Sequence, residues 1–205
     1  MVAAGTGTRF GGAKQYAALG ARRVLDHAIE VAVSRSDGVV VVTPPDGAES
    51  PASAIDGVDA VVSGGATRSA SVRAGLAAVP DDAEVVVVHD AARPLAGADL
   101  FDATVAAVRA GADGAIPAVP VTDSLRHRSA GPVDRDELVA VQTPQAFAAT
   151  TLRAAHAAAP EATDDAAVVE AVGGRIELVA GDRWNLKITE PDDLVVAAAL
   201  LAARG

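Results

Sequence analysis

Only two of the 17 basic residues in this 205-residue chain are lysines, Lys14 and Lys187. Arginine fills every other basic position, so each lysine raises the question of what an ammonium does there that a guanidinium cannot. An ammonium is a compact charge that can lie against a phosphate oxygen, whereas a guanidinium is a larger planar fork. Lys14 follows a glycine-rich loop, and Lys187 lies in residues 184–189, which we expect to end a strand. The pattern favours two ammonium groups that converge on one polyphosphate. The alternative is that both lysines are incidental replacements of arginine.

The glycine-rich loop follows a short apolar segment, residues 2–4, that we expect to form a strand. Glycines at positions 5, 7, 11 and 12 allow backbone N–H groups to turn toward an anion, and Arg9 adds a second cation. The loop is not a dinucleotide-binding fingerprint, because Phe10 stands where the third glycine would fall. It is not a Walker P-loop, because no Gly-Lys-Ser/Thr run is present. An ordinary strand-to-helix turn is the alternative interpretation.

A second polar cluster, residues 89–94, directly follows the valine run at residues 85–88. Ligands of open α/β sheets bind at the carboxyl ends of strands, which makes this cluster a candidate site. Asp90 can hold a hydroxyl group or a hydrated metal ion, and Arg93 can bind a phosphate. The alternative is that His89 and Asp90 only cap the loop.

A third cluster, residues 64–71, follows the apolar residues 60–62. Its small side chains let a flat base or a ribose lie against the backbone. Ser71 can form a hydrogen bond with a base edge. The alternative function of this segment is a helix N-cap at Thr67, and the two roles are compatible.

These clusters need a scaffold that brings strand ends together. The runs at residues 39–42 and 85–88 are β-branched without polar alternation, which is typical of strands buried on both faces of a parallel sheet. Amphipathic, alanine-rich segments separate the strands. We therefore predict one α/β domain over residues 1–205, with a doubly wound, mostly parallel, Rossmann-like sheet. The expected helices are residues 24–35, 67–79, 100–110, 148–158, 164–172 and a last one starting at Pro191.

The pattern changes between residues 114 and 147. Residues 116–121 indicate a strand interrupted by prolines, a polar stretch follows at residues 127–136, and a strand returns at residues 138–141. This order predicts an extended β-arm that leaves the sheet and comes back. A further strand is expected at residues 176–179.

Composition excludes several classes of function. A net charge of −10 argues against general binding to nucleic acid or to anionic membranes, so an anionic substrate needs a local basic pocket. The chain has no cysteine, which excludes disulfides, thiolate metal sites and cysteine nucleophiles. The longest apolar run, residues 194–203, is shorter than the roughly 20 residues of a membrane span. No signal peptide is evident, and we expect a cytoplasmic protein.

Taken together, the motifs resemble the family of 2-C-methyl-D-erythritol 4-phosphate cytidylyltransferases of the non-mevalonate isoprenoid pathway. The first loop is shared by many nucleotidyltransferases, whereas the other segments, in this order, are more specific. The resemblance covers essentially the whole chain and rests on residues 3–9, 14–16, 64–65, 89–94, 143–145, 163–164 and 185–189.

The resemblance implies transfer of a cytidylyl group from CTP to methylerythritol phosphate, with Mg²⁺ bound mainly through the CTP phosphates and no protein metal site. It implies a homodimer joined through the β-arm, with each arm reaching the partner's site. The implied catalytic residues are Arg9, Lys14 and Lys187. The implied CTP-binding residues are Ala3, Ala4, Gly5, Gly7, Gly65 and Ser71. The implied substrate-binding residues are Asp90, Arg93, Ser124, Arg135, Thr143 and Thr163.

The chain departs from the family pattern in a few places. Strand one is almost absent, and the spacing between Arg9 and Lys14 is short, with Ala13 in place of the common proline. Ser124 replaces the usual threonine and keeps its hydroxyl. The alternatives are a ribitol 5-phosphate cytidylyltransferase, a nucleotidyltransferase with another acceptor, and a non-catalytic nucleotide-binding module. No catalytic histidine is expected, because an acceptor phosphate is already an anionic nucleophile.

Overall fold

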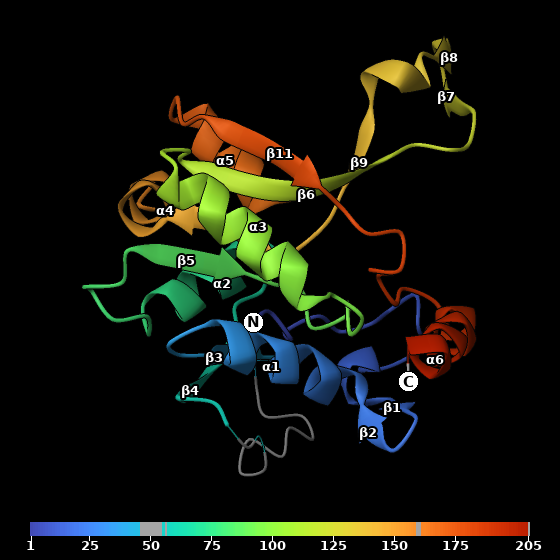
Figure 1. Cartoon of the computed structure of the whole chain (residues 1–205), viewed down its shortest axis with the longest axis horizontal. Helices are drawn as coiled ribbons and strands as arrows, with labels where there is room; N and C mark the ends of the chain where they lie inside the picture. Colours follow the sequence, from blue (N-terminus) through green and yellow to red (C-terminus); the bar gives the residue numbers. More distant parts are fainter. Residues whose placement is uncertain (46–54, 56, 159–160, 205) are drawn as a thin grey trace.

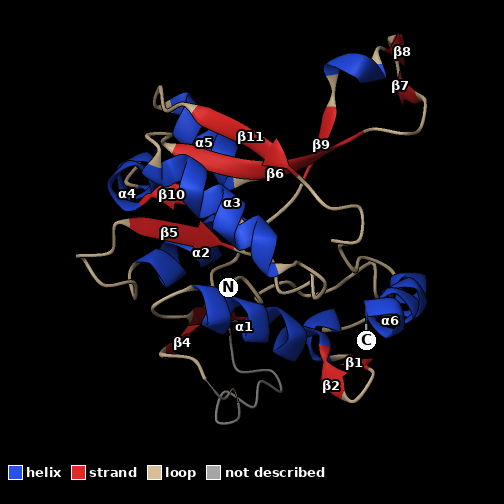
Figure 2. Ribbon diagram, in the orientation of Figure 1, coloured by secondary structure: helices blue, strands red, loops and turns tan. Residues whose placement is uncertain are grey.

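The computed structural model describes residues 1–45, 55, 57–158 and 161–204. A mixed β-sheet crosses the molecule, and helices lie on both of its faces (Figures 1 and 2). The main strands are β3 (Val40–Thr43), β4 (Ala60–Ser63), β5 (Val85–Val88), β6 (Gly114–Pro120), β9 (Val139–Val141), β10 (Gln145–Ala148) and β11 (Ile176–Ala180). The helices are α1 (Val24–Arg35), α2 (Arg68–Leu76), α3 (Ala98–Arg109), α4 (Ala149–His156), α5 (Asp165–Ala171) and α6 (Pro191–Arg204).

Two groups of strands make up the sheet, and the amino terminus joins them. One group has the order β11–β6–β10–β5, and the other is the parallel pair β3–β4. Val2 forms parallel bridges to Val42, at the end of β3, and to Asp90, just after β5. The expected strand at residues 2–4 is therefore reduced to single bridges at Val2 within the described residues.

Strand β10 is antiparallel to both of its neighbours, β5 and β6, while β11 is parallel to β6. The doubly wound α/β class is confirmed, but the sheet is mixed at this point. Strand β10 was not predicted, because Gln145–Ala148 has no continuous apolar run and its Gln145 is polar yet buried.

Apolar side chains recur at helical spacing and fix which face each helix covers. In α3, Leu100, Phe101, Thr104, Ala107 and Val108 are buried, and this spacing places them on one stripe. Helices α1 and α3 pack on one face of the sheet. Helices α2, α4 and α5 pack on the other, around the buried Phe147 of β10.

The predicted arm is present as a long excursion between β6 and β9 (Figure 1). It carries the small hairpin β7 (Leu125–His127) and β8 (Gly131–Val133), followed by the short 3-10 helix η3 (Arg135–Glu137). The prolines do not interrupt β6, contrary to the prediction. The carbonyl of Pro117 still accepts a hydrogen bond from Gln142 N at 2.8 Å, so only the N–H of the proline is missing from the ladder.

Several predicted boundaries shift. Helix α2 begins at Arg68 with Thr67 as its N-cap, as predicted, but ends at Leu76 rather than at residue 79. Residues 184–189 form a loop, so the strand predicted before Lys187 is wrong. This loop follows β11 and precedes α6, which packs on the short strand β1 (Ala18–Leu19), the partner of β2 (Arg22–Arg23). No helix among the described residues is long and apolar enough to cross a membrane.

Candidate active site

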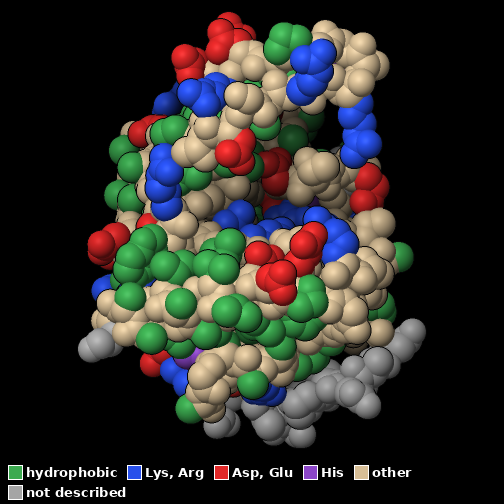
Figure 3. Space-filling view, turned by 90° about the vertical axis from the view of Figure 1, so that its right-hand side faces the viewer, with side chains coloured by type: hydrophobic (Ala, Val, Ile, Leu, Met, Phe, Trp, Pro, Cys, Tyr) green, Lys and Arg blue, Asp and Glu red, His purple; other side chains and the backbone are tan. Residues whose placement is uncertain are grey.

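The predicted site clusters come from distant parts of the chain and meet beside the ends of β3 and β5. The glycine loop follows Val2, which bridges the ends of these two strands. The loop of Lys187 is linked to the segment after β5 by a hydrogen bond from Ile188 N to Ala92 O at 2.8 Å. Figure 3 shows Lys and Arg side chains gathered in a hollow on this side of the molecule, with acidic side chains near its edge. The arrangement provides the local basic pocket that a net charge of −10 makes necessary for an anionic ligand.

Asp90 is the central anion of the site. Its carboxylate accepts a hydrogen bond from Lys187 Nζ at 2.6 Å, and the Arg68 guanidinium lies 3.9 Å from its other oxygen. Burial alone raises the pKa of Asp90, but Lys187 and Arg68 outweigh it and hold the pKa at about 2. Asp90 is therefore ionised at neutral pH and orients the Lys187 ammonium.

The second lysine lies in the same charge cluster. Lys14 Nζ donates a hydrogen bond to Ile188 O, in the residue next to Lys187. Burial lowers the pKa of Lys14, and the positive charges of Lys187 and Arg9 lower it further, against a smaller opposing effect of Asp90. The two lysines and Arg9 therefore lie in one cluster, and their binding of one polyphosphate stays a prediction.

The glycine loop is a tight turn stabilised by hydrogen bonds to its backbone carbonyl groups. The amides of Phe10, Gly11 and Gly12 all donate to Gly7 O, at 2.9 to 3.2 Å. Gly7 has a φ of 66°, and a Cβ there would lie 1.8 Å from Gly12 O, so only glycine fits. Gln15 is buried and donates to Ala3 O at 2.9 Å and to Gly5 O at 3.3 Å, which fixes the loop on the sheet.

The residues expected to line a cytidine pocket also come together. A Cβ on Gly64 would lie 2.7 Å from both the Ala4 Cβ and the Ser71 Oγ, so the absence of a side chain lets the two segments approach. The Ser71 hydroxyl accepts from Gly65 N at 3.2 Å and donates to Thr67 O at 2.9 Å. In this structure Ser71 holds the loop of Gly65, and its contact with a base edge stays a prediction.

Behind Asp90, a buried chain of hydrogen bonds fixes the loop after β5. Asp90 N donates to Thr143 Oγ1 at 3.0 Å, and Thr143 Oγ1 lies 2.9 Å from His89 Nδ1. Burial lowers the pKa of His89 to about 3, so the imidazole is neutral and accepts at Nδ1 while Nε2 donates to Arg93 O at 3.3 Å. His89 and Thr143 therefore position Asp90.

Arg93 reaches the loop that carries Lys187. Its guanidinium donates to Asn185 O at 2.7 Å, and the buried Asn185 side chain donates to Thr143 O at 2.9 Å. These contacts tie the loops of Asp90 and Lys187 to each other. Burial lowers the pKa of Arg93, which nonetheless stays a cation.

Sequence reasoning missed a buried ionic chain that extends away from Asp90. Arg68 lies 2.8 Å from Asp165 Oδ2, and the other oxygen of Asp165 lies 3.0 Å from His156 Nε2. The side chains of Asp165 and His156 are only 1% and 3% exposed. The sequence offered one signal, Asp165, which is the second of two aspartates after Thr163. It did not stand out because Asp164, the first of the two, is a helix N-cap.

Other predicted site residues lie apart from this cluster. Ser124 and Arg135 are exposed on the arm, which extends away from the body (Figure 1), and Arg135 donates to Thr122 O at 2.6 Å within the arm. Thr163 is exposed just before α5, near the start of α2, where Ala162 N donates to Ser69 Oγ at 3.1 Å. A role of the two arm residues in this site requires a second copy of the chain.

A metal ion has no dedicated cage here. Among the described residues, no three His, Cys, Asp or Glu side chains gather in a way that could hold a metal ion. Asp90 is the acidic group of the cluster, and two cations already neutralise it.

Comparison with known proteins identifies the family. The profile of the family described as 2-C-methyl-D-erythritol 4-phosphate cytidylyltransferase matches residues 1–203. The chain belongs to this family. The Rhodococcus opacus protein named 2-C-methyl-D-erythritol 4-phosphate cytidylyltransferase is 44% identical over 209 residues, which cover 97% of this chain and 92% of that protein.

Solved structures of cytidylyltransferases of this family share the fold. The Thermus thermophilus enzyme superposes with a TM-score of 0.81 at 36% identity, over 98% of this chain and 97% of that one.

A bifunctional enzyme named IspD/IspF from Dinoroseobacter shibae is 47% identical over 215 residues. That match covers 100% of this chain but 53% of the relative, so the chain spans about half the length of the bifunctional proteins it matches.

Proposed function

We propose that this member of the cytidylyltransferase family transfers a cytidylyl group from CTP to 2-C-methyl-D-erythritol 4-phosphate and releases pyrophosphate. The observation that carries the proposal is the convergence of Lys14 and Lys187 beside Asp90, next to a glycine loop that is held in a tight turn. A polyphosphate and a second anion must be brought together in such a reaction. Clustered cations reduce their repulsion.

The reaction needs positioning and charge compensation more than covalent help. An oxygen of the acceptor phosphate attacks the α-phosphorus of CTP, and the bond from that phosphorus to the oxygen bridging to the β-phosphate breaks. Lys14 and Arg9 neutralise the triphosphate, and Lys187, oriented by Asp90, neutralises the α-phosphate. The acceptor phosphate is ionised beforehand, so no side chain has to remove a proton.

We also propose that Mg²⁺ accompanies CTP. The absence of a protein cage among the described residues is consistent with a metal held mainly by phosphate oxygens. When bound, the metal withdraws charge from the phosphates and orients them. Asp90 is a structural anion for Lys187 and Arg68 in this scheme rather than a primary metal ligand.

The acceptor side of the proposal places Asp90, Arg93 and Thr163 around methylerythritol phosphate. The carboxylate oxygens of Asp90 can accept hydrogen bonds from the hydroxyl groups of the polyol. Arg93 supplies a cation on the same loop. Ser124 and Arg135 complete the acceptor site from the arm of a second copy, because the arm carries them away from the body of their own chain (Figure 1). The homodimer and the cytoplasmic location remain predictions from the sequence.

Pyrophosphate release tests the proposal directly. The chain is incubated with CTP, Mg²⁺ and either methylerythritol phosphate or ribitol 5-phosphate, and pyrophosphate is measured by a coupled assay. We expect release with methylerythritol phosphate and little with ribitol 5-phosphate. The reverse preference supports the ribitol alternative, and CTP binding without pyrophosphate from either acceptor supports a non-catalytic nucleotide-binding module.

A further inference from the structure

A row of alternating charges leads from Lys187 into the interior of the protein. Lys187 contacts one oxygen of Asp90 at 2.6 Å, and Arg68 lies 3.9 Å from the other oxygen. Arg68 in turn lies 2.8 Å from Asp165, whose second oxygen lies 3.0 Å from His156 Nε2. The proposed reaction gives roles to Lys187 and Asp90, whereas the inner members of this charge row have no part in it.

The charge row becomes more buried toward its inner end. The side chain of Lys187 is 43% exposed, that of Arg68 24% and that of Asp165 only 1%. A carboxylate as deep as that of Asp165 is costly unless an opposite charge compensates it. Burial lowers the pKa of Arg68, but Asp165 and Asp90 outweigh it and raise the pKa, so the guanidinium is a cation. The cation that compensates a buried carboxylate therefore also reaches the site.

The inner members of the charge row stand at the ends of helices, which fixes where they lie. Arg68 is the first residue of α2, Asp165 is the first residue of α5, and His156 is the last residue of α4. The three helices pack on the same face of the sheet. A hydrogen bond from Ala162 N to Ser69 Oγ at 3.1 Å ties the start of α2 to the segment before α5. Packing of the helices thus sets the place of the Arg68 guanidinium.

We propose that Arg68, anchored by Asp165, is a positioning residue that holds one oxygen of Asp90 so that the other oxygen orients the Lys187 ammonium. The role rests on the proposed function, because it serves the transfer step. A carboxylate that faced Lys187 alone would set its whole negative charge against that ammonium. Arg68 takes up part of this charge and leaves more of the Lys187 charge for the phosphate.

The chemistry of arginine suits this position. Arg68 faces Asp90 with Nε and Asp165 with Nη1, so one planar fork lies between two carboxylates. Lys187 carries three N–H donors, which lets it keep its contact with Asp90 while it meets a phosphate oxygen.

A double-mutant cycle tests the role in the reaction. Arg68→Gln should lower kcat by at least about tenfold and change KM for CTP by less than about threefold, because the charge of Lys187 acts mainly in the transition state. In the Asp90→Asn background the same change should lower kcat by less than about twofold, since Arg68 then has no carboxylate to hold. Equal losses in the two backgrounds mean a purely structural role or a direct contact with substrate, and either would overturn the proposal. The matched control is Arg73→Gln, which removes a cation of the same helix that pairs with the exposed Glu161, and it should keep at least about half of the wild-type kcat.

The scarcity of lysine provides a readout that does not depend on the reaction. In a chain labelled with carbon-13 at lysine Cε, the NMR spectrum contains the signals of Lys14 and Lys187 alone, and Lys14→Arg assigns them. We expect Arg68→Gln to move the Lys187 signal more than the Lys14 signal, and Arg73→Gln to move neither. An unmoved Lys187 signal in folded Arg68→Gln would overturn the proposal. A wild-type chain that releases no pyrophosphate, but whose Lys187 signal depends on Arg68, would refute the proposed reaction and still support the positioning of Lys187.

A second variant covers the case in which Arg68→Gln does not fold. Arg68→Gln combined with Asp165→Asn removes both charges of the buried pair and leaves neither uncompensated. The combined variant should show the same loss of kcat and the same movement of the Lys187 signal. A folded combined variant with normal kcat and an unmoved Lys187 signal would overturn the proposal.

Discussion

The carboxylate of Asp90 contacts two cations, with Lys187 at one oxygen and Arg68 near the other. Lys187 binds it at 2.6 Å and is 43% exposed, so its ammonium faces both the carboxylate and the open site. Lys187→Arg introduces a larger fork whose charge is more diffuse, and we expect kcat to fall by about 100-fold or more. Because the side chain is partly exposed, Tm should change little. The measurements are steady-state pyrophosphate release and thermal unfolding, and near-normal turnover in this variant would show that the ammonium is incidental.

Asp165 offers a contrast, because its role is to hold Arg68. Its side chain is 1% exposed and contacts both Arg68 and His156. Asp165→Asn removes the nearer of the two carboxylates that contact Arg68, and we expect a loss of about 3–5 kcal/mol in the free energy of unfolding. The control is Glu161→Gln, which removes an exposed partner of Arg73 on the same helix and should lower the free energy of unfolding far less. Equal effects in urea unfolding would contradict the importance of the buried pair.

The sequence singled out the residues that we propose to contact ligand, but not those that hold them in place. Lys14, Lys187 and Asp90 stand out by their rarity or by their position after a valine strand, both of which a sequence displays. Arg68 and Asp165 lie 97 positions apart in numbering and meet only through the packing of α2 against α5. Neither residue type nor local spacing could reveal this pair.

At the scale of elements, the glycine loop depends on one backbone conformation. Gly7 has a φ of 66°, and a Cβ would overlap Gly12 O, whereas a Cβ on Gly12 would meet no atom within 4 Å. Gly7→Ala should therefore open the loop and lower kcat/KM for CTP by at least about tenfold. Gly12→Ala is the matched control and should keep most of the activity. Similar losses in the two variants would show that the shape of the turn is not what matters.

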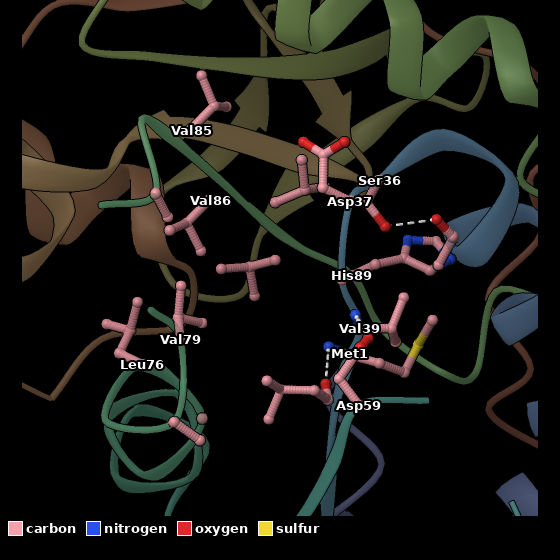
Figure 4. A pocket seen from close by; sticks show the side chains of 18 of the residues that line it. Met1, Ser36, Asp37, Val39, Asp59, Leu76, Val79, Val85, Val86 and His89 are labelled. Atoms are coloured by element: carbon pink, nitrogen blue, oxygen red, sulfur yellow. Dashed lines mark hydrogen bonds between the residues drawn. The ribbon is translucent and has the colours of Figure 1, made fainter. Parts of the chain in front are cut away.

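The buried amino group of Met1 (Figure 4), which donates to Val40 O at 2.8 Å, leads to a dependence of stability on pH. Burial lowers the pKa of the Met1 amino group from 8.0 to about 6, and Asp90 opposes the shift. The unfolded chain binds more protons than the folded chain between these values, so this group makes stability rise from pH 6 to 8. His89 contributes in the same direction below about pH 6.5. The measurement is Tm between pH 6 and pH 8, and a Tm that does not rise over this interval would contradict the effect of the amino group.

Helices and strands could be predicted from the sequence where their apolar residues follow one strong pattern. The valine strands, the arm and the main helices follow from continuous or amphipathic patterns. Strand β10 and the loop of Lys187 did not, because Gln145–Ala148 is short and mixed, and residues 184–189 look apolar enough for a strand. The tertiary contacts of Asn185 and Ile188 set the conformation of that loop. Only the folded chain displays these contacts.

At the scale of the whole molecule, our proposal divides the acceptor side of the site between the body and the arm. Lys187 lies in the body beside Asp90, whereas Arg135 is exposed on the arm, which carries it away from that cluster (Figure 1). If the arm serves a partner, Arg135 of one copy and Lys187 of the other form one site. A monomeric enzyme would have no use for an exposed hairpin that places a cation so far from its own lysines.

Mixed dimers test this arrangement. Arg135→Ala and Lys187→Ala homodimers should each lose most activity, because every site then lacks one cation. In a heterodimer of the two variants, one site carries both changes and the other carries neither. The heterodimer is obtained by co-expression of the two variants with different affinity tags, followed by sequential purification. It should recover about half of the wild-type activity per dimer, because one of its two sites is then intact. Verified heterodimers that stay as inactive as their parents would show that Arg135 does not act across the interface, and an Arg135→Ala homodimer with normal turnover would remove it from the site altogether.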